Sequence, residues 1–220
     1  MNIIDVDAHP PIDEKKREEF YKTLSLLGIT RALGAPLEEG MTKKESNLLA
    51  IRNFNCRSMW GHPDCADTLE GASLLTVDSA WLPEAEEILR IAESKRIPVL
   101  LRNENESQIR ALAREYPSLP LIVGGSGSRV AKPSLAYELM RDLPQVYLNL
   151  SGAVWTYNYV LHEWIQRLPT HRLLFGTDYP YANPASKLAA LRWELRHTAA
   201  SVTEAILGGN ALDLLKEAFV

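Results

Sequence analysis

The chain opens with Ile3-Ile4-Asp5-Val6-Asp7-Ala8-His9-Pro10, and near its end it carries Leu173-Leu174-Phe175-Gly176-Thr177-Asp178-Tyr179-Pro180. Each segment is a short apolar run, typical of a buried strand, that ends in side chains able to bind a metal. Side chains alternate along a strand, so Asp7 and His9 share one face. Asp178 would meet them if the chain closed into a barrel. The function of the protein depends on whether these two segments converge.

Between the two segments, apolar runs of strand length alternate with stretches of helical spacing. The predicted strands are residues 2–6, 29–33, 72–77, 97–101, 121–123, 146–150 and 173–176. The predicted helices are a stretch that begins at Asp13 and residues 42–53, 82–94, 106–116, 134–143, 159–168, 185–197 and 202–218. Residues 54–70 show no clear period and leave room for one further strand.

The strands are continuous apolar runs rather than alternating ones, as expected when both faces of a sheet are covered by helices. Strict alternation of strand and helix favours a parallel α/β fold. We therefore expect a compact TIM-like (β/α)₈ barrel, a single domain of residues 1–220, in which one strand–helix unit is irregular or missing. The alternative is an open, doubly wound sheet. Against it, no glycine-rich dinucleotide or phosphate signature follows the first strand.

The composition of the chain excludes some kinds of binding partner. The chain has 220 residues and a formal net charge of -4, which argues against nucleic acid or an anionic membrane. Only two cysteines are present, Cys56 and Cys65, so a disulfide framework is not expected. We expect a cytoplasmic protein with a small-molecule substrate. The sequence leaves a homo-oligomer open.

Four segments of the chain resemble one family. The first segment resembles the first-strand motif of the amidohydrolase-2 group, the amidohydrolase superfamily members related to aminocarboxymuconate semialdehyde decarboxylase. Phe175-Gly176-Thr177-Asp178-Tyr179-Pro180 resembles its eighth-strand motif. Val146-Tyr147-Leu148-Asn149-Leu150-Ser151-Gly152 is similar to its seventh strand, and Ile206-Leu207-Gly208-Gly209-Asn210-Ala211 to its C-terminal helix. The resemblance implies a TIM barrel with a divalent metal, often zinc, for hydrolysis or non-oxidative decarboxylation of small carboxylated molecules.

The metal ligands of the family are only partly matched. The resemblance implies Asp7, His9 and Asp178 as metal ligands, with Asp7 at a position that is usually histidine. The family's histidine after strand 5 is replaced by Arg102, and its histidine after strand 6 falls where this chain has Gly125-Ser126-Gly127. Two outcomes stay open: a divalent metal, zinc first, or no metal at all.

Arg102 could take the place of the ion. Its guanidinium stays charged at any working pH, repels a metal and pairs well with carboxylates. If it replaces the metal, it should lie within about 4 Å of Asp7 or Asp178. Glu104, two residues further on, would face the same way if the strand continued, and could then help to hold a metal.

Two functions from different classes are compatible with these residues. The first is a hydrolase or decarboxylase for a small carboxylated substrate, with Asp178 and Arg102 as catalytic residues. Arg102, Asn149 and Ser151 would then bind the substrate. The second is a barrel that has lost catalysis and serves as a binding or scaffold protein, in which Arg102 neutralises carboxylates left from a lost metal site.

Overall fold

The structure is a computed structural model that describes residues 2–11, 13–33, 51–52, 57–60, 72–124, 133–152 and 159–215. Gly125 and most of the aperiodic stretch 54–70 therefore lie outside the described residues. Within the described part, no helix combines the length and the apolar character needed to cross a membrane.

The described strands form two sheets. Strands β1 (Ile3–Asp5) and β2 (Ile29–Ala32) pair in parallel. The second sheet has seven strands in the order β3-β4-β5-β6-β7-β8-β9. All its pairings are parallel except β3 with β4. Its strands are β3 (Ile51–Arg52), β4 (Arg57–Trp60), β5 (Ala72–Asp78), β6 (Val99–Arg102), β7 (Leu121–Val123), β8 (Val146–Asn149) and β9 (Leu173–Leu174).

Backbone hydrogen bonds beyond the ends of β1 and β9 join the two sheets. The N–H of Val6 donates to the carbonyl oxygen of Phe175 (3.0 Å), and the N–H of His9 donates to that of Tyr179 (2.7 Å). The N–H of Asp178 donates in return to the carbonyl oxygen of Asp7 (2.6 Å). The strands thus follow one another as β2-β1-β9-β8-β7-β6-β5-β4, which is the order of a TIM barrel. Between β2 and β4 the described residues show no pairing.

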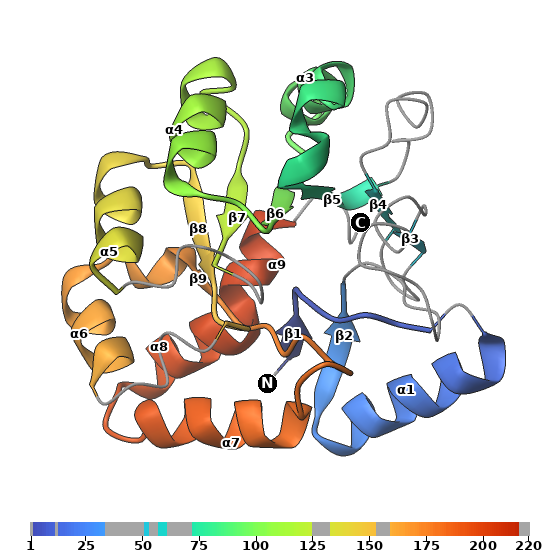
Figure 1. The fold of residues 1–220 in the computed structure, drawn as a ribbon. Helices are drawn as coiled ribbons and strands as arrows, with labels where there is room; N and C mark the ends of the chain where they lie inside the picture. Colours follow the sequence, from blue (N-terminus) through green and yellow to red (C-terminus); the bar gives the residue numbers. More distant parts are fainter. Residues whose placement is uncertain are drawn as a thin grey trace.

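Helices follow most strands and surround them in the view of Figure 1. Helix α1 (Glu14–Leu26) connects β1 to β2, and Asp13 caps it by accepting a hydrogen bond from the N–H of Lys16 (2.9 Å). The later crossover helices are α3 (Glu86–Ser94), α4 (Glu106–Glu115), α5 (Pro133–Asp142) and α6 (Val160–Arg167), and α7 (Pro184–Glu194) follows the last strand, β9. The chain then forms α8 (Ala200–Glu204), a π-helical turn Ala205–Gly209 and α9 (Asn210–Leu214).

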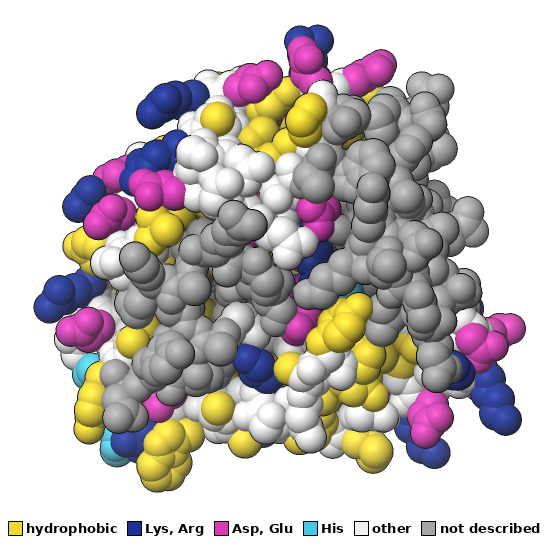
Figure 2. Space-filling view, in the orientation of Figure 1, with side chains coloured by type: hydrophobic (Ala, Val, Ile, Leu, Met, Phe, Trp, Pro, Cys, Tyr) yellow, Lys and Arg dark blue, Asp and Glu magenta, His cyan; other side chains and the backbone are white. Residues whose placement is uncertain are grey.

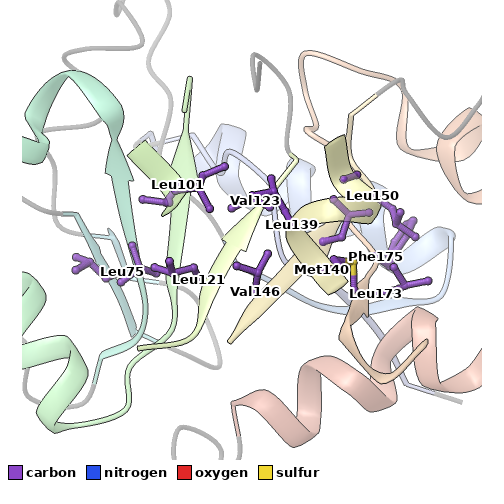
Figure 3. Packing of buried hydrophobic residues seen from close by; sticks show 14 of the residues in the cluster. Leu75, Leu101, Leu121, Val123, Leu139, Met140, Val146, Leu150, Leu173 and Phe175 are labelled. Atoms are coloured by element: carbon purple, nitrogen blue, oxygen red, sulfur yellow. The ribbon is translucent and has the colours of Figure 1, made fainter. Parts of the chain in front are cut away.

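Each central strand divides its side chains between two apolar clusters, because neighbouring residues point to opposite faces. Leu75 and Leu101 belong to the large cluster between strands and helices, where Figure 3 shows them with Val123, Val146 and side chains of α5. A smaller cluster lies on the other face of the same strands, and its buried members are Ile4, Val6, Leu33, Leu74, Leu100, Ile122, Leu174, Ala211 and Leu215. Since β1, β5, β6, β7, β9 and the residue after β2 all contribute to it, this cluster fills the inside of the barrel.

The structure confirms the α/β barrel class and corrects details. All seven predicted strands are present, and β4 supplies the further strand within 54–70. The predicted helix 42–53 is wrong at its end, because Ile51 and Arg52 pair with β4 as β3. The predicted helix 202–218 is not regular, since a π-helical turn with two glycines interrupts it. A Cβ at Gly208 in that turn would collide with the backbone of Asn2, so this turn packs directly under β1.

Candidate functional site

The predicted site residues all follow the carboxyl ends of barrel strands. Arg102 is the last residue of β6 and Asn149 the last of β8. Asp7 and His9 lie just past β1, and Asp178 lies past β9. Figure 2 shows acidic, basic and histidine side chains close together near the centre of the view. In a TIM barrel this end of the strands carries the chemistry.

Asp7, His9 and Asp178 converge, as the sequence predicted. Nε2 of His9 lies 3.0 Å from Oδ1 of Asp178 and 3.8 Å from Oδ1 of Asp7. One potential ligand atom from each residue lies within 4.8 Å of the others, and all three residues are buried. Among the described residues they form the one such group, and it is a candidate metal site.

The guanidinium of Arg102 lies in the middle of this group. Its Nη2 is 2.9 Å from Nε2 of His9, 3.2 Å from Oδ1 of Asp178 and 3.4 Å from Oδ1 of Asp7. The predicted contact of Arg102 with both carboxylates is therefore present. Arg102 itself is only 6% exposed, so water screens these interactions poorly.

The position of Arg102 conflicts with a bound metal. Zinc binds its ligands at about 2 Å, so an ion on Asp7, His9 and Asp178 would use the lone pairs that Nη2 now faces. It would also meet a permanently charged guanidinium at close range. The residues present, with Arg102 in this position, do not fit a metal ion. Arg102 places a fixed positive charge beside the three candidate ligands.

The second oxygen of Asp7 accepts hydrogen bonds from the end of strand β8 and the residues just after it. Oδ2 of Asp7 accepts hydrogen bonds from Nδ2 of Asn149 (2.9 Å) and from the hydroxyl of Ser151 (2.6 Å). Gly176 makes this possible, because a Cβ there would collide with the Asn149 side chain. Asn149 and Ser151 are thus in the site, as predicted, and in this structure they orient Asp7.

A second cation borders the site from helix α7. Nζ of Lys187 donates to the carbonyl oxygens of Ser151 (2.7 Å) and Gly152 (3.4 Å). Burial lowers the pKa of Lys187, while the nearby charges of Asp178 and Asp7 act in the opposite direction. The loop after β8 is therefore fixed between Lys187 on one side and Asp7 on the other.

The sequence did not predict two residues, Asp5 and Thr177, that hydrogen-bond beside the site. Asp5 is buried and accepts hydrogen bonds from the N–H groups of Asp7 (3.1 Å) and Thr177 (3.0 Å) and from the hydroxyl of Thr177. Burial raises the pKa of Asp5 to about 7, against the opposing effect of these hydrogen bonds. The spacing Asp5-x-Asp7-x-His9 was the available signal, since a carboxylate inside an apolar strand needs partners.

Other polar residues near the mouth have different partners. The strand does not continue past Arg102, because Asn103 adopts a left-handed backbone conformation (φ 55°). Glu104 consequently accepts a hydrogen bond from the N–H of Gly124 (3.0 Å), and it is not part of the candidate metal group. The ring of Tyr181 packs edge-on against the imidazole of His9, with 5.1 Å between centroids. It forms an aromatic wall beside the polar cluster.

Comparison with known proteins finds one matching family model. A family model described as amidohydrolase matches residues 70–216. Among curated proteins, none matches the sequence.

Solved structures match over nearly the whole chain at low sequence identity. A 2,6-dihydroxybenzoate decarboxylase in complex with 2,6-dihydroxybenzoate is 14% identical, with a TM-score of 0.68 and 99% of each chain covered. A dihydroxybenzoic acid decarboxylase from Polaromonas sp. JS666, with bound manganese and the inhibitor 2-nitroresorcinol, is 16% identical. Its TM-score is 0.66, covering 98% of this chain and 97% of that one. A dihydroorotase from Campylobacter jejuni is 13% identical, with a TM-score of 0.62 and coverage of 98% and 83%. These likenesses establish the fold.

Proposed function

The chain belongs to the amidohydrolase family, and on that premise we propose that it is a hydrolase or non-oxidative decarboxylase for a small carboxylated molecule. The observation that carries the proposal is the buried group of two carboxylates, one imidazole and one guanidinium at the mouth of the barrel. Buried groups of this kind are typical of sites that transfer protons.

Asp178 and His9 are the proposed proton-transfer pair. The 3.0 Å contact between Oδ1 of Asp178 and Nε2 of His9 allows a proton to be held between them. In a decarboxylation, the bond from the substrate carbon to its carboxylate breaks, the carboxylate leaves as carbon dioxide, and this pair donates a proton to the carbanion that remains. In the hydrolysis of an amide, the same pair takes a proton from water as the water oxygen bonds to the carbonyl carbon, and it gives that proton to the nitrogen as the carbon–nitrogen bond breaks.

Arg102 is the proposed electrostatic group. It would bind the substrate carboxylate and stabilise negative charge that develops during the reaction. The manganese-containing decarboxylase and the dihydroxybenzoate complex support a carboxylated aromatic substrate, because they share this fold. Asn149 and Ser151 remain proposed substrate-binding residues, which in this structure contact Asp7.

We further propose that Arg102 serves in place of the divalent metal, zinc included. The support is the location of Nη2, within 3.4 Å of all three candidate ligands. Asp7, His9 and Asp178 would hold an ion if the arginine were removed. Among the described residues the group has three protein ligands, fewer than the four of a structural zinc site.

The function is tested by turnover and by metal content together. We expect release of carbon dioxide from a 2,6-dihydroxybenzoate-type acid or hydrolysis of dihydroorotate, unchanged after treatment with a chelator. Arg102→His combined with Gly125→His restores two histidines at family positions and should increase zinc affinity at least tenfold. One tightly held equivalent of metal in the wild-type protein would refute the replacement of the metal. No turnover of any carboxylated aromatic or cyclic amide would instead favour a binding or scaffold protein.

Three further expectations from composition are also proposals. We propose one barrel domain over residues 1–220, a cytoplasmic location, and no nucleic-acid or membrane partner. The net charge of -4 supports the last of these. Sedimentation of the purified protein would decide whether it is a homo-oligomer.

A further inference from the structure

Two buried side chains that the proposed reaction does not use join the segments that carry the site. Asp5 and Thr177 are both 0% exposed. One oxygen of the Asp5 carboxyl group accepts from the N–H groups of Asp7 and Thr177, and the other accepts from the Thr177 hydroxyl. A single side chain thus contacts the segment after β1 and the segment after β9.

Thr177 also holds the residue on the far side of Asp178. Its hydroxyl oxygen accepts a hydrogen bond from the N–H of Tyr179 (3.1 Å). The N–H of Asp178 itself donates to the carbonyl oxygen of Asp7 (2.6 Å). The backbone of Asp178 is therefore fixed before, at and after the residue.

This fixation coincides with an unfavourable backbone conformation. Asp178 has φ 58°, in the left-handed region that residues with a Cβ seldom adopt. The φ angle determines where the side chain points, and here it directs the carboxylate at Nη2 of Arg102 (3.2 Å) and Nε2 of His9 (3.0 Å). If Asp178 relaxed to a negative φ, both contacts would be lost.

We propose that Asp5 and Thr177 are positioning residues that act through the backbones of Asp7 and Asp178. They hold the two carboxylates around Arg102 and keep Asp178 in its left-handed conformation. Their hydrogen bonds go to the backbone N–H groups of Asp7, Thr177 and Tyr179, so the effect on the reaction is indirect. The catalytic part of this inference rests on the proposed function, whereas the geometric part does not.

If the hydrogen bonds of Asp5 and Thr177 only stabilised the fold, their removal would have a different effect. It would lower the melting temperature and leave the Asp178–Arg102 distance unchanged. The decisive measurement is therefore the position of the Asp178 carboxylate, determined by crystallography of variant proteins, with the melting temperature as a second readout.

The test compares Thr177→Val, which loses the hydroxyl, with Thr177→Ser, which keeps it. Thr76→Val is the matched control, because Thr76 is a buried barrel threonine whose hydroxyl lacks a hydrogen-bond partner among the described residues. We expect the distance from Asp178 Oδ1 to Arg102 Nη2 to exceed 4 Å in Thr177→Val and to stay near 3.2 Å in Thr177→Ser and Thr76→Val. Thr177→Ala serves in the same comparison should the valine variant fail to fold.

An unchanged distance in Thr177→Val or Thr177→Ala would overturn the proposal, whatever the melting temperature. With a substrate of the proposed reaction, we expect Thr177→Val to lower kcat at least tenfold while KM changes less than threefold. A wild-type protein without turnover contradicts the proposed function alone, since the crystallographic result needs no substrate.

Discussion

Two buried arginines lie at opposite ends of the barrel and have opposite kinds of partner. Arg102, at the carboxyl end of β6, faces ionisable side chains. Arg172 directly precedes β9 at the amino end, and within the described part of the chain its guanidinium donates to backbone carbonyl oxygens alone. These are the carbonyls of Met140, Leu143 (2.8 Å), Pro144 (3.2 Å) and Val146 (3.0 Å).

The two arginines differ in whether their partners are backbone carbonyls or ionisable side chains. Fixed carbonyl dipoles stabilise Arg172 and connect the end of α5 to the starts of β8 and β9. Burial lowers the pKa of Arg172, yet its partners cannot change charge. The partners of Arg102 are two carboxylates and an imidazole, so the same kind of buried cation here faces ionisable groups of the candidate site. The positions of the two arginines agree with this difference. In TIM barrels, residues at the amino end of the strands contribute to stability, and residues at the carboxyl end carry the chemistry.

The largest loss of stability should come from Arg172. Arg172→Met removes the donor from four carbonyl oxygens, at roughly 1 kcal/mol each, so we expect a loss of about 4 kcal/mol in the free energy of unfolding. Urea unfolding measures it, with Arg192→Met on the exposed face of α7 as the control. The contacts of Arg102 should stay unchanged. A loss below about 1 kcal/mol would show that the carbonyls do not depend on Arg172.

Arg102→Met should cost somewhat less, about 3 kcal/mol, because it leaves buried carboxylates without their counter-charge. Unlike the loss at Arg172, this loss should be reversed by a divalent ion. Zinc binding to the emptied group should raise the melting temperature of Arg102→Met and leave those of Arg172→Met and the wild-type protein unchanged. Equal responses of the two variants to zinc would end the distinction between the two arginines.

A titration of Asp5 extends the comparison to pH. The pKa of Asp5 is raised from 3.8 to about 7, so the folded state binds this proton more tightly than the unfolded state. Its stabilising effect is complete below about pH 4 and is lost as the pH rises through 7. Asp5→Asn removes the titration and preserves the hydrogen bonds, because its Oδ1 can accept both N–H groups and its Nδ2 can donate to Thr177.

Relative to wild type, Asp5→Asn should therefore gain about 4 kcal/mol between pH 4 and pH 8, since each unit of the pKa shift corresponds to about 1.4 kcal/mol. Urea unfolding at a series of pH values measures the difference. Arg172→Met, at the other end of the barrel, should run parallel to wild type over the same range. Parallel curves for Asp5→Asn would mean that Asp5 does not titrate in this window.

The sequence predicted the barrel because apolar runs mark buried strands wherever both faces are covered. Residues 72–78 and 121–123 are examples, with nearly every described side chain buried. It failed at Ile51 and Arg52, where a two-residue strand depends on its partner β4 and not on local spacing. Pairing between strands is a tertiary effect that a helix propensity cannot anticipate.

The site was predictable where a polar residue ends an apolar run. Asp7, His9, Arg102, Asn149 and Asp178 all satisfy that rule. This rule did not find Asp5 and Thr177, because their hydrogen bonds to each other form only when the segments of β1 and β9 lie side by side. The rule also did not find Arg172, because its partners are backbone atoms, which carry no sequence signal.

Lys187 is the intermediate case, and it should give the smallest effect. Like Arg172 it donates to backbone carbonyls, those of Ser151 and Gly152, but it lies at the carboxyl end, near Asp7. Lys187→Met should lower the free energy of unfolding by about 1 kcal/mol, and Lys187→Arg by less.

A double-mutant cycle decides to which end of the barrel Lys187 belongs. If Lys187 supports Asp7 through the Ser151 hydroxyl, then Lys187→Met and Ser151→Ala should couple by at least about 0.5 kcal/mol, because both act on one hydrogen-bonded chain. Lys187→Met and Arg172→Met share no partner and should be additive. Coupling to Arg172 without coupling to Ser151 would assign Lys187 to the structural network. In that case Arg102 alone would provide the positive charge that the two carboxylates require.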